Sequence, residues 1–332
     1  MKRLPAFVLT VLLTAVCLFS GCNISFPGNS NDMITGRIYS NPELYKTGSF
    51  TYDAQSVNSV EIDWCVGRIE LVCSDNPTLS VREAGESLPQ EKQLHYLVKD
   101  GILRIQFWRS GLNSSVDDKQ KHITVEIPKD SNIKVINTSG SIYAGSVTAA
   151  HAVLDTVSGS INITALSADS AKISSVSGSI KIDQAQIINE FGAAGTSDSV
   201  KISELSAQTA GIGTTSGSIS VNSAVIAGAL TLGSVSGSVD ASNISCDTAE
   251  ISTTSGDVGM GLASCISASA NTVSGSIDIT LSGGLGATVE YKSISGRMSS
   301  ALEYTVSEDK YIFGDGACRI FARTTSGDIS IK

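Results

Sequence analysis

The chain has 332 residues, 41% of them hydrophobic, and its 23 lysine and arginine residues against 32 aspartate and glutamate residues give a formal net charge of −9. Removing residues 1–21 takes away Lys2 and Arg3 and no acidic residue, so the net charge of the remainder is −11. An acidic chain without a basic run lacks the positive surface that nucleic acids and anionic lipids attract, so we expect no nucleic-acid partner. The length is sufficient for two domains.

Residues 1–21 are typical of an export signal. Lys2 and Arg3 precede a mostly apolar run, Leu4 to Phe19, that is shorter than the about 20 residues of a membrane-spanning helix. The ending "LFSGC" resembles a bacterial lipoprotein signal, which implies that Cys22 becomes the lipid-carrying first residue of the mature protein. Phe19 departs from the leucine usual at that position, so cleavage by an ordinary signal peptidase and retention as an uncleaved anchor stay open as alternatives.

Residues 22–44 predict a flexible tether, because the stretch "NISFPGNSNDM" is polar and contains glycine and proline. Together with a lipid on Cys22, this tether predicts a protein attached to the cell membrane on its extracytoplasmic face. We expect the membrane to be contacted through that lipid.

Residues 45–130 predict a less regular β region. The segments "VNSVEIDWCVGRIELVC" and "LVKDGILRIQFW" alternate between apolar and polar residues, as strands with one buried face do. The segment "HITVEIP" leads directly into the repeats that follow. An open end of a repeated β structure exposes unpaired strand edges, so we interpret this region as an N-terminal cap.

Residues 131–332 repeat a corner of the type "TVSGSI" with a period of 19 to 20 residues. The corner positions are Gly140, Gly159, Gly178, Asp198, Gly217, Gly237, Gly256, Gly275, Gly296 and Gly327. Apolar residues recur two and four positions after the corner, as at Ile161 and Ile163, and five and seven positions before it, as at Ile173 and Ala171. Each period therefore predicts two short strands joined at a corner, where glycine allows backbone angles that other residues resist.

One period cannot bury its own apolar face, so we expect successive periods to stack. The prediction is an all-β, parallel β-helix-like solenoid, built from a single strand path with coils of 19 to 20 residues. A β-sandwich also has many short strands, but it would not require the same residue at each turn. The last step between corners is 31 residues long, and its segment 299–318 predicts an excursion, either a hairpin or a plain surface loop.

The lipoprotein-like signal, the irregular β start and the tandem corners resemble the bacterial putative-adhesin family, whose domain has no known function. The resemblance covers about residues 40–332, and the corners "TTSGDV" at 253–258 and "TTSGDI" at 324–329 are its closest matches. It implies a β-solenoid at the cell surface and provides no catalytic residues.

Five cysteines remain after Cys17, in the signal, and Cys22. Cys246 and Cys265 both lie ten residues before a corner, so stacked coils would place them side by side as a candidate disulfide. The alternative is two buried thiols in a ladder of alanines. Cys65 and Cys73 could also form a disulfide, and one cysteine is left over. No metal site is expected, because Cys-x-x-Cys pairs are absent and no histidine accompanies these cysteines.

Enzyme chemistry is not expected, because the outward residues three positions after the corners are mixed and do not form a cluster. These residues are Tyr143, Asn162, Lys181, Lys201, Ser220, Asp240, Gly259 and Asp278. The three histidines, His95, His122 and His151, lie in separate segments. The corner hydroxyls recur in nearly every coil, so we interpret them as solvated ladders rather than nucleophiles. We expect no cofactor.

Three functions follow from these observations. The first is a membrane-anchored, non-catalytic adhesion or binding protein that presents its solenoid to an envelope glycan or protein. The second is an envelope scaffold or stress-response accessory protein. The third is a polysaccharide-active enzyme on a β-helix.

Overall fold

The computed structural model of the chain describes residues 37–76, 78–84, 88–114 and 121–332. The predicted signal (1–21), Cys22 and residues 23–36 of the predicted tether lie outside the described residues. The described residues divide into two compact units, 37–178 and 179–332, which we call the N-terminal and C-terminal units. Within the described ranges, no helix is long and apolar enough to cross a membrane. The domain boundaries predicted from the sequence stay predictions.

The N-terminal unit is built from strands joined by short turns and 3-10 helices. Its described elements are β1 (Lys46–Thr47), β2 (Phe50–Asp53), β3 (Ser59–Val66), β4 (Ile69–Ser74), β5 (Thr78–Glu83), β6 (His95–Lys99), β7 (Ile102–Gln106), β8 (Ile123–Pro128), β9 (Ser131–Ser139), β10 (Ile142–Thr156), β11 (Ile161–Ser175), η1 (Pro42–Leu44), η2 (Ala54–Ser56) and η3 (Gln90–Lys92).

Consecutive coils of this unit pair in parallel and in register. β10 pairs with β11 so that Ile142 lies beside Ile161 and Leu154 beside Ile173, all four of them buried. Equivalent residues of neighbouring coils therefore stack inward as the period predicts. This pairing is that of a parallel solenoid and not of a sandwich of antiparallel sheets, so the predicted fold class is confirmed.

Two further coils precede residue 131, and the chain does not place them in sequence order. The coil of β3 and β4 turns at Gly67 and pairs in parallel with β9 and β10, while β7 and β8 pair in parallel with the other edge of β3 and β4. β7 and β8 thus form the outermost coil of the unit, although they follow β3 and β4 in sequence. Their outer edges are covered by antiparallel strands, β6 on β7 and β5 on β8.

Bulky side chains fill the core of these first coils. Trp64, Phe107 and Trp108 are fully buried, and the ring centroids of Trp64 and Phe107 lie 4.9 Å apart in an edge-to-face arrangement. The buried Lys121 ammonium forms an ion pair with Glu83 and donates to the carbonyl oxygens of Lys92 (2.8 Å) and Phe107 (2.6 Å). Burial lowers the pKa of Lys121, an effect that Glu83 opposes. Because a buried charge is costly unless it is paired and hydrogen-bonded, this network specifies the local packing.

The corner glycines are required by close approach between coils. A methyl group added at Gly159 would overlap the carbonyl oxygen of Gly140, and one added at Gly237 would overlap that of Gly217. Neither Gly159 nor Gly237 has a positive φ. The expectation that these corners need glycine for its backbone angles is therefore wrong at these positions, and the reason is steric.

A ladder of buried hydroxyls lies three residues before the corners. Most of these hydroxyls donate to the carbonyl oxygen of the corner glycine on the neighbouring coil, as Thr253 does to Gly237 at 2.8 Å and Thr272 to Gly256 at 2.9 Å. Thr214 Oγ1 accepts from Gly217 N at 3.2 Å. Thr156, Ser175, Thr214, Ser234, Thr253, Thr272 and Thr324 are all buried. The interpretation of the corner hydroxyls as solvated is wrong for this ladder, most of whose members satisfy buried carbonyl groups.

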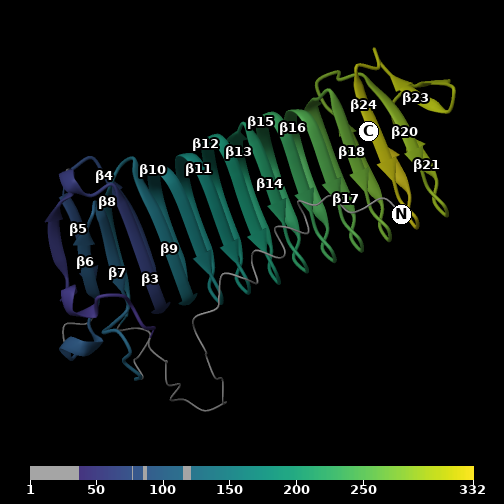
Figure 1. Ribbon diagram of the computed structural model, residues 1–332. Helices are drawn as coiled ribbons and strands as arrows, with labels where there is room; N and C mark the ends of the chain where they lie inside the picture. The colour runs from purple at the N-terminus through teal and green to yellow at the C-terminus, as the bar shows by residue number, and fades with distance from the viewer. Residues whose placement is uncertain (1–36, 77, 85–87, 115–120) are drawn as a thin grey trace. The chain divides into compact units, whose positions relative to one another are not determined.

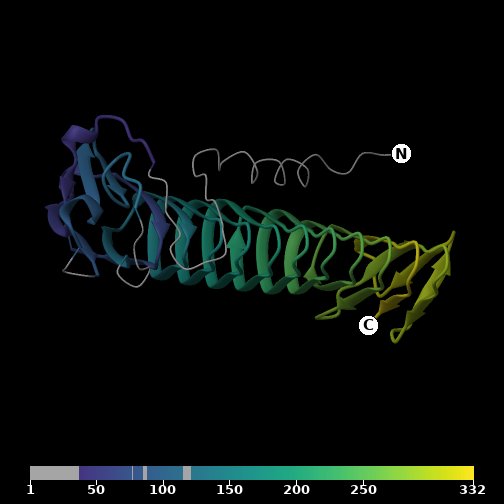
Figure 2. The ribbon, with the colours of Figure 1, turned by 90° about the horizontal axis from the view of Figure 1, so that it is seen from below.

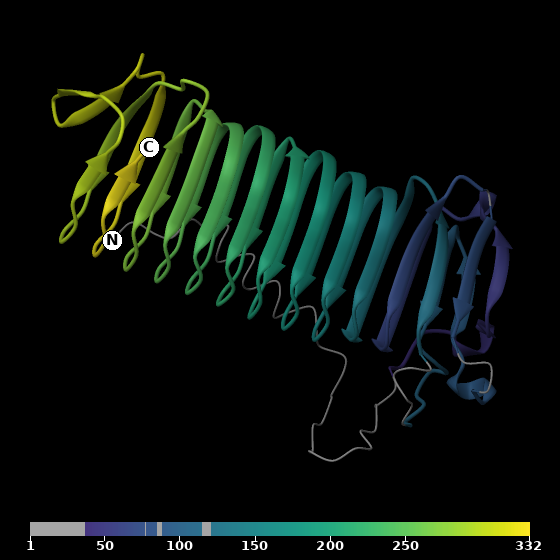
Figure 3. The same cartoon turned by 180° about the vertical axis from the view of Figure 1, so that it is seen from behind.

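The C-terminal unit continues the same design within its own residues (Figure 1). Its strands are β12 (Ile180–Gly195), β13 (Val200–Ala207), β14 (Thr209–Gly213), β15 (Ile219–Gly233), β16 (Val239–Ser252), β17 (Val258–Ser264), β18 (Ser267–Asn271), β19 (Ile277–Leu281), β20 (Ala287–Lys292), β21 (Met298–Ser300), β22 (Thr305–Ser307), β23 (Lys310–Phe313), β24 (Cys318–Arg323) and β25 (Ile329–Ile331). Figure 2 shows the green coils of this unit as successive arcs, and Figure 3 shows their corner loops along one edge.

The last coil in sequence is not the last coil in space. β24 pairs in parallel with both β18 and β20, and β25 pairs with both β19 and β21, so residues 318–331 lie between two earlier coils. Figure 1 shows β24 between β18 and β20. Residues 301–317, most of the predicted excursion 299–318, leave the coils, and within them β22 and β23 form an antiparallel hairpin whose second strand covers β20 at Ala287–Val289.

Side-chain size is consistent with this order. The inward position five residues before the corner carries Ile251, Ala270 and Ala322 on adjacent coils, but Tyr291 on the β20 coil. At this outermost coil the ring of Tyr291 stays partly exposed and packs against Tyr311 of the hairpin, with ring centroids 5.3 Å apart. The smaller Ala322 lies on the interior coil of β24 and β25.

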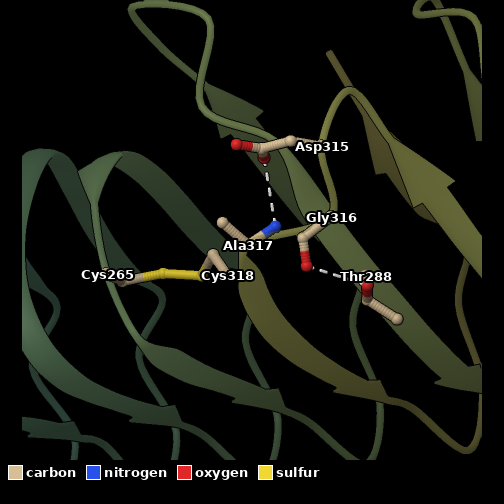
Figure 4. The surroundings of a disulfide bond; sticks show 6 residues. All are labelled: Cys265, Thr288, Asp315, Gly316, Ala317 and Cys318. Carbon is tan, nitrogen blue, oxygen red and sulfur yellow. Dashed lines mark hydrogen bonds between the residues drawn. A yellow bond between two sulfur atoms is a disulfide. The ribbon is translucent and has the colours of Figure 1, made fainter.

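The predicted Cys246–Cys265 disulfide is wrong. Cys265 forms a disulfide with Cys318, with Cα atoms 5.5 Å apart, because the inserted last coil places Cys318 beside it (Figure 4). Cys246 is a buried thiol whose pKa is raised by burial to about 11, and Cys65 and Cys73 also lie outside any disulfide. Beside the disulfide, Ala317 N donates to Asp315 Oδ1 (3.1 Å) and Thr288 Oγ1 to the Gly316 carbonyl (2.9 Å).

Candidate binding cavity

The outward residues after the corners form rows of mixed character on each unit. In the C-terminal unit, Lys181, Lys201, Ser220, Asp240, Gly259 and Asp278 lie side by side in register. Lys181 pairs with Asp183 of its own strand at 3.0 Å, and both side chains are largely exposed. Such a row offers a polar surface without a group of residues arranged for catalysis.

The three histidines make separate local contacts. His122 Nδ1 accepts from Arg68 N at 2.7 Å, His151 Nδ1 lies 2.7 Å from Ser170 Oγ, and His95 Nδ1 lies 3.0 Å from the Gln93 carbonyl oxygen. Among the described residues, no group of three histidine, cysteine, aspartate or glutamate side chains could bind a metal ion.

A cavity of about 580 Å³ lies in the N-terminal unit. Its floor is the outward face of the sheet formed by β3, β7 and β9. Glu61, Arg104 and Lys134 lie on this face and alternate along their strands with residues buried in the core. Its cover is the segment 38–45, including Tyr39 and Tyr45. A half-open space between a sheet and a crossing segment is the usual form of a small-molecule site.

Several interactions fix the covering segment on the sheet. Arg37 forms an ion pair with Asp63 and donates to Thr138 Oγ1 at 3.3 Å. The Arg37 carbonyl accepts from Gly111 N at 2.9 Å, and Tyr39 N donates to Ser110 Oγ at 2.9 Å. The last residues of the predicted tether therefore contribute to the cavity and are not merely a spacer.

The charged groups that line the cavity balance one another. Arg104 Nε lies 3.1 Å from Glu61 Oε2, and Asp63 is paired with Arg37. The lining acids are Glu61, Asp63 and Asp100, and the lining bases are Lys99, Arg104 and Lys134. Glu61 and Asp63 are therefore each paired with a guanidinium group.

The most informative residue of the cavity is Gln106, which is 2% exposed and lies on the same strand face as Arg104. Its Nε2 makes no hydrogen bond of normal geometry within the described chain. The Tyr45 hydroxyl is nevertheless near: burial raises the pKa of Tyr45, and Arg104 and the Gln106 amide partly offset this rise. A buried amide donor without a partner is unusual in a native protein and marks a position where a ligand can supply an acceptor.

Sequence reasoning did not find this cavity. The segments "VEID" and "LRIQ" contain the pattern that could have indicated a site: each strand places acidic, basic or amide side chains on the face away from the core. Nothing in the repeat period indicates that residues 38–45 cross this face. Gly67 was also missed as a corner, although Val60, Ile62, Ile69 and Leu71 occupy the same positions around it as in later coils.

Comparison with known proteins gives a family and distant structures. The family model described as Toastrack DUF4097 matches residues 90–262 and 225–332, well over half of the chain. The structure of a putative cell adhesion protein from Clostridium sporogenes ATCC 15579 is 10% identical over 87% of this chain and 99% of that chain, with a TM-score of 0.19. That of a putative adhesin from Bacteroides fragilis NCTC 9343 is 14% identical over 86% of this chain and 97% of that chain, with a TM-score of 0.34. A search of curated proteins finds no match.

Proposed function

We propose that this chain, which belongs to the Toastrack DUF4097 family, is a non-catalytic binding protein attached by a lipid on Cys22 to the extracytoplasmic face of the cell membrane. It binds a ligand of the cell envelope in the cavity of its N-terminal unit. The observation that carries this proposal is Gln106, a buried amide that lines the cavity and whose Nε2 makes no hydrogen bond of normal geometry among the described residues. The lining carboxylates Glu61 and Asp63 are each engaged in an ion pair with an arginine.

The position of the cavity fits the proposed anchor. The covering segment includes the last residues of the predicted tether, so the cavity would lie close to the point where the tether joins the folded protein. The lipid would keep the protein at the membrane, because each buried methylene of an acyl chain contributes about 0.8 kcal/mol. Recognition and attachment would then reside in different parts of the chain.

The test compares Cys22→Ser with Cys17→Ser, a matched change inside the predicted signal. We expect Cys22→Ser to abolish fatty-acid labelling and detergent-phase partitioning while leaving the β-rich circular dichroism and the melting temperature of the soluble product unchanged. Cys17→Ser should keep both properties of the lipidated protein. Cells expressing Cys22→Ser should lose attachment to isolated envelope material, whereas the soluble product should still bind that material.

Two results would contradict the proposal. Fatty-acid labelling of the Cys22→Ser protein, or its retention in the membrane through the uncleaved Leu4–Phe19 segment, would replace the lipid anchor with a signal anchor. Turnover of a labelled envelope polysaccharide by the purified protein would replace binding with catalysis.

An envelope scaffold is the second candidate, favoured by one end of the C-terminal unit. Among the described strands, β21 pairs only with β25, and the neighbouring side chains of Leu302, Tyr304 and Val306 are exposed. An unpaired strand edge beside apolar side chains is a site of protein association. Concentration-dependent sedimentation that Val306→Asp abolishes would support this candidate, and a monomer at all concentrations would exclude self-assembly.

A further inference from the structure

We infer that the ligand of the cavity in the N-terminal unit is an uncharged saccharide of one or two pyranose rings. This inference rests on the proposed function, because it names the ligand class of the same cavity. It follows from four properties of the cavity: its charge balance, its buried amide donor, its mixture of aromatic and polar surface, and the backbone pairing of its floor.

The first property is the charge balance of the lining. Three acidic and three basic side chains line the cavity, and Arg104 is already paired with Glu61. On the floor of the cavity an anionic ligand would have to compete with Glu61 for the guanidinium, and a cationic ligand with Arg37 for Asp63. The other lining charges, Lys99, Asp100 and Lys134, are of both signs and exposed. A neutral ligand needs neither exchange, and it can accept from Arg104 while donating to Glu61 without disturbing the pair.

The second property is the demand for an acceptor at one place. Gln106 Nε2 is a buried donor that makes no hydrogen bond of normal geometry among the described residues, although its amide interacts with the nearby Tyr45 hydroxyl. Burial raises the pKa of Tyr45, so its hydroxyl stays protonated at neutral pH and can both donate and accept. A sugar hydroxyl also both donates and accepts, so one hydroxyl can satisfy Gln106 and Tyr45 together.

The third property is the amphipathic lining. The covering segment contributes the rings of Tyr39 and Tyr45 together with Ile38, and the floor contributes Arg104 and Gln106. A pyranose ring has apolar C–H faces and a polar rim, so it can pack its faces on tyrosine while its hydroxyls contact the floor. The volume of about 580 Å³ lies within the usual range of small-ligand sites.

The fourth property argues against an extended peptide. β3 pairs with both β7 and β9, and β7 pairs with both β3 and β6, so the backbone groups of the floor are already used. A peptide that adds to a sheet needs a free strand edge, which these strands do not offer. The groups available to a ligand are side chains, as saccharide recognition requires.

The test is isothermal titration calorimetry of the complete mature chain carrying Cys22→Ser. The probes are three neutral disaccharides (chitobiose, cellobiose and maltose), digalacturonate as a matched anionic sugar, and an uncharged hexapeptide. We expect at least one neutral disaccharide to bind and digalacturonate and the peptide not to. Gln106→Leu should weaken that binding about tenfold, the equivalent of one hydrogen bond to a buried donor.

Two variants separate a binding effect from a folding effect. Gln186→Leu changes an exposed glutamine of β12 and should leave the affinity unchanged. Tyr39→Ser acts in the covering segment, away from the sheet core, and should weaken binding severalfold with an unchanged melting temperature. Retention of full affinity in both Gln106→Leu and Tyr39→Ser would overturn the assignment of the cavity.

The outcomes also separate this inference from the proposed function. If no neutral disaccharide binds, or if digalacturonate or the peptide binds in its place, the saccharide class is wrong; envelope binding that Gln106→Leu abolishes would then leave the proposed function standing. If a disaccharide binds but the unmodified chain carries no lipid, the anchor is wrong and the inference stands.

Discussion

The outermost coil of each unit has strand edges that would otherwise be unpaired, and the two units cover these edges in different ways. In each unit a coil that comes later in sequence lies beyond or between earlier ones, and an antiparallel strand covers the exposed edge. In the N-terminal unit both strands of the outermost coil are covered, by β6 and β5. In the C-terminal unit β23 covers β20 only at Ala287–Val289. A repeat with a free edge must be closed, but the repeat itself does not dictate how.

The means of stabilisation differ accordingly. The first coils of the N-terminal unit are filled by Trp64, Phe107 and Trp108 around the buried Lys121–Glu83 pair, whereas the last coils of the C-terminal unit are joined by the Cys265–Cys318 disulfide. In the regular coils most inward residues are aliphatic, with the fully buried Phe191 as an exception, and corner glycines and buried hydroxyls recur in most coils. The buried ion pair and the disulfide are features of the irregular parts, and the cavity also lies there.

The largest expected effect is at the buried ion pair. Lys121→Met should destabilise the protein by about 3–5 kcal/mol, because it leaves Glu83 buried without its partner. Lys181→Met in the C-terminal unit removes an exposed pair with Asp183 and should cost no more than about 1 kcal/mol. Urea unfolding followed by far-UV circular dichroism measures both.

A double variant sharpens this test. In the protein, Leu94 N donates to Glu83 Oε2 at 2.8 Å. Combining Lys121→Met with Glu83→Gln should regain part of the lost stability, because the amide oxygen can still accept from Leu94 N and no charge is left buried. If Lys121→Met and Lys181→Met cost the same, the buried pair has no special role and this part of the comparison fails.

The next effect is at the disulfide. Cys318→Ala should lower the stability of the C-terminal unit by about 2–4 kcal/mol, since the bond closes a chain segment with a sequence separation of 53. Cys265→Ala should match it, and reducing agent should have no further effect on either variant. Cys246→Ala, in the same ladder but outside the disulfide, should cost less and stay sensitive to reduction. Peptide mapping that links Cys246 to Cys265 would refute this pairing.

The smallest of the three effects is at a corner glycine. Gly159→Ala should cost about 1–3 kcal/mol, because the added methyl overlaps the Gly140 carbonyl oxygen and forces neighbouring coils apart. Gly145→Ala in the same unit meets no atom within 4 Å and should be neutral or stabilising by up to about 1 kcal/mol. Thermal melting of the pair decides the matter, and equal melting temperatures would show that close approach is not the reason for the repeated glycine.

The sequence by itself determined the regular part of this protein. The period of 19 to 20 residues, with apolar residues at fixed distances from each corner, requires coils that stack like on like, because only a neighbouring coil can bury the apolar face of each one. It also indicated an irregular β start and an excursion near the end. The candidate cavity could not be predicted from the sequence. Neither could the reason for the corner glycine, which depends on a carbonyl oxygen of another coil.

The tertiary structure alone decided which coil lies beside which. Cys265 is bonded to Cys318 and not to Cys246, because β24 pairs between β18 and β20 and so places Cys318 beside Cys265. Gln106 lines a cavity because residues 38–45 return across a sheet whose strands are up to about 100 positions away in the chain. The stacking of coils can be predicted from a periodic sequence, because it depends on residues at fixed spacing. The closure of an end depends on the sizes and charges of single side chains brought together from distant segments.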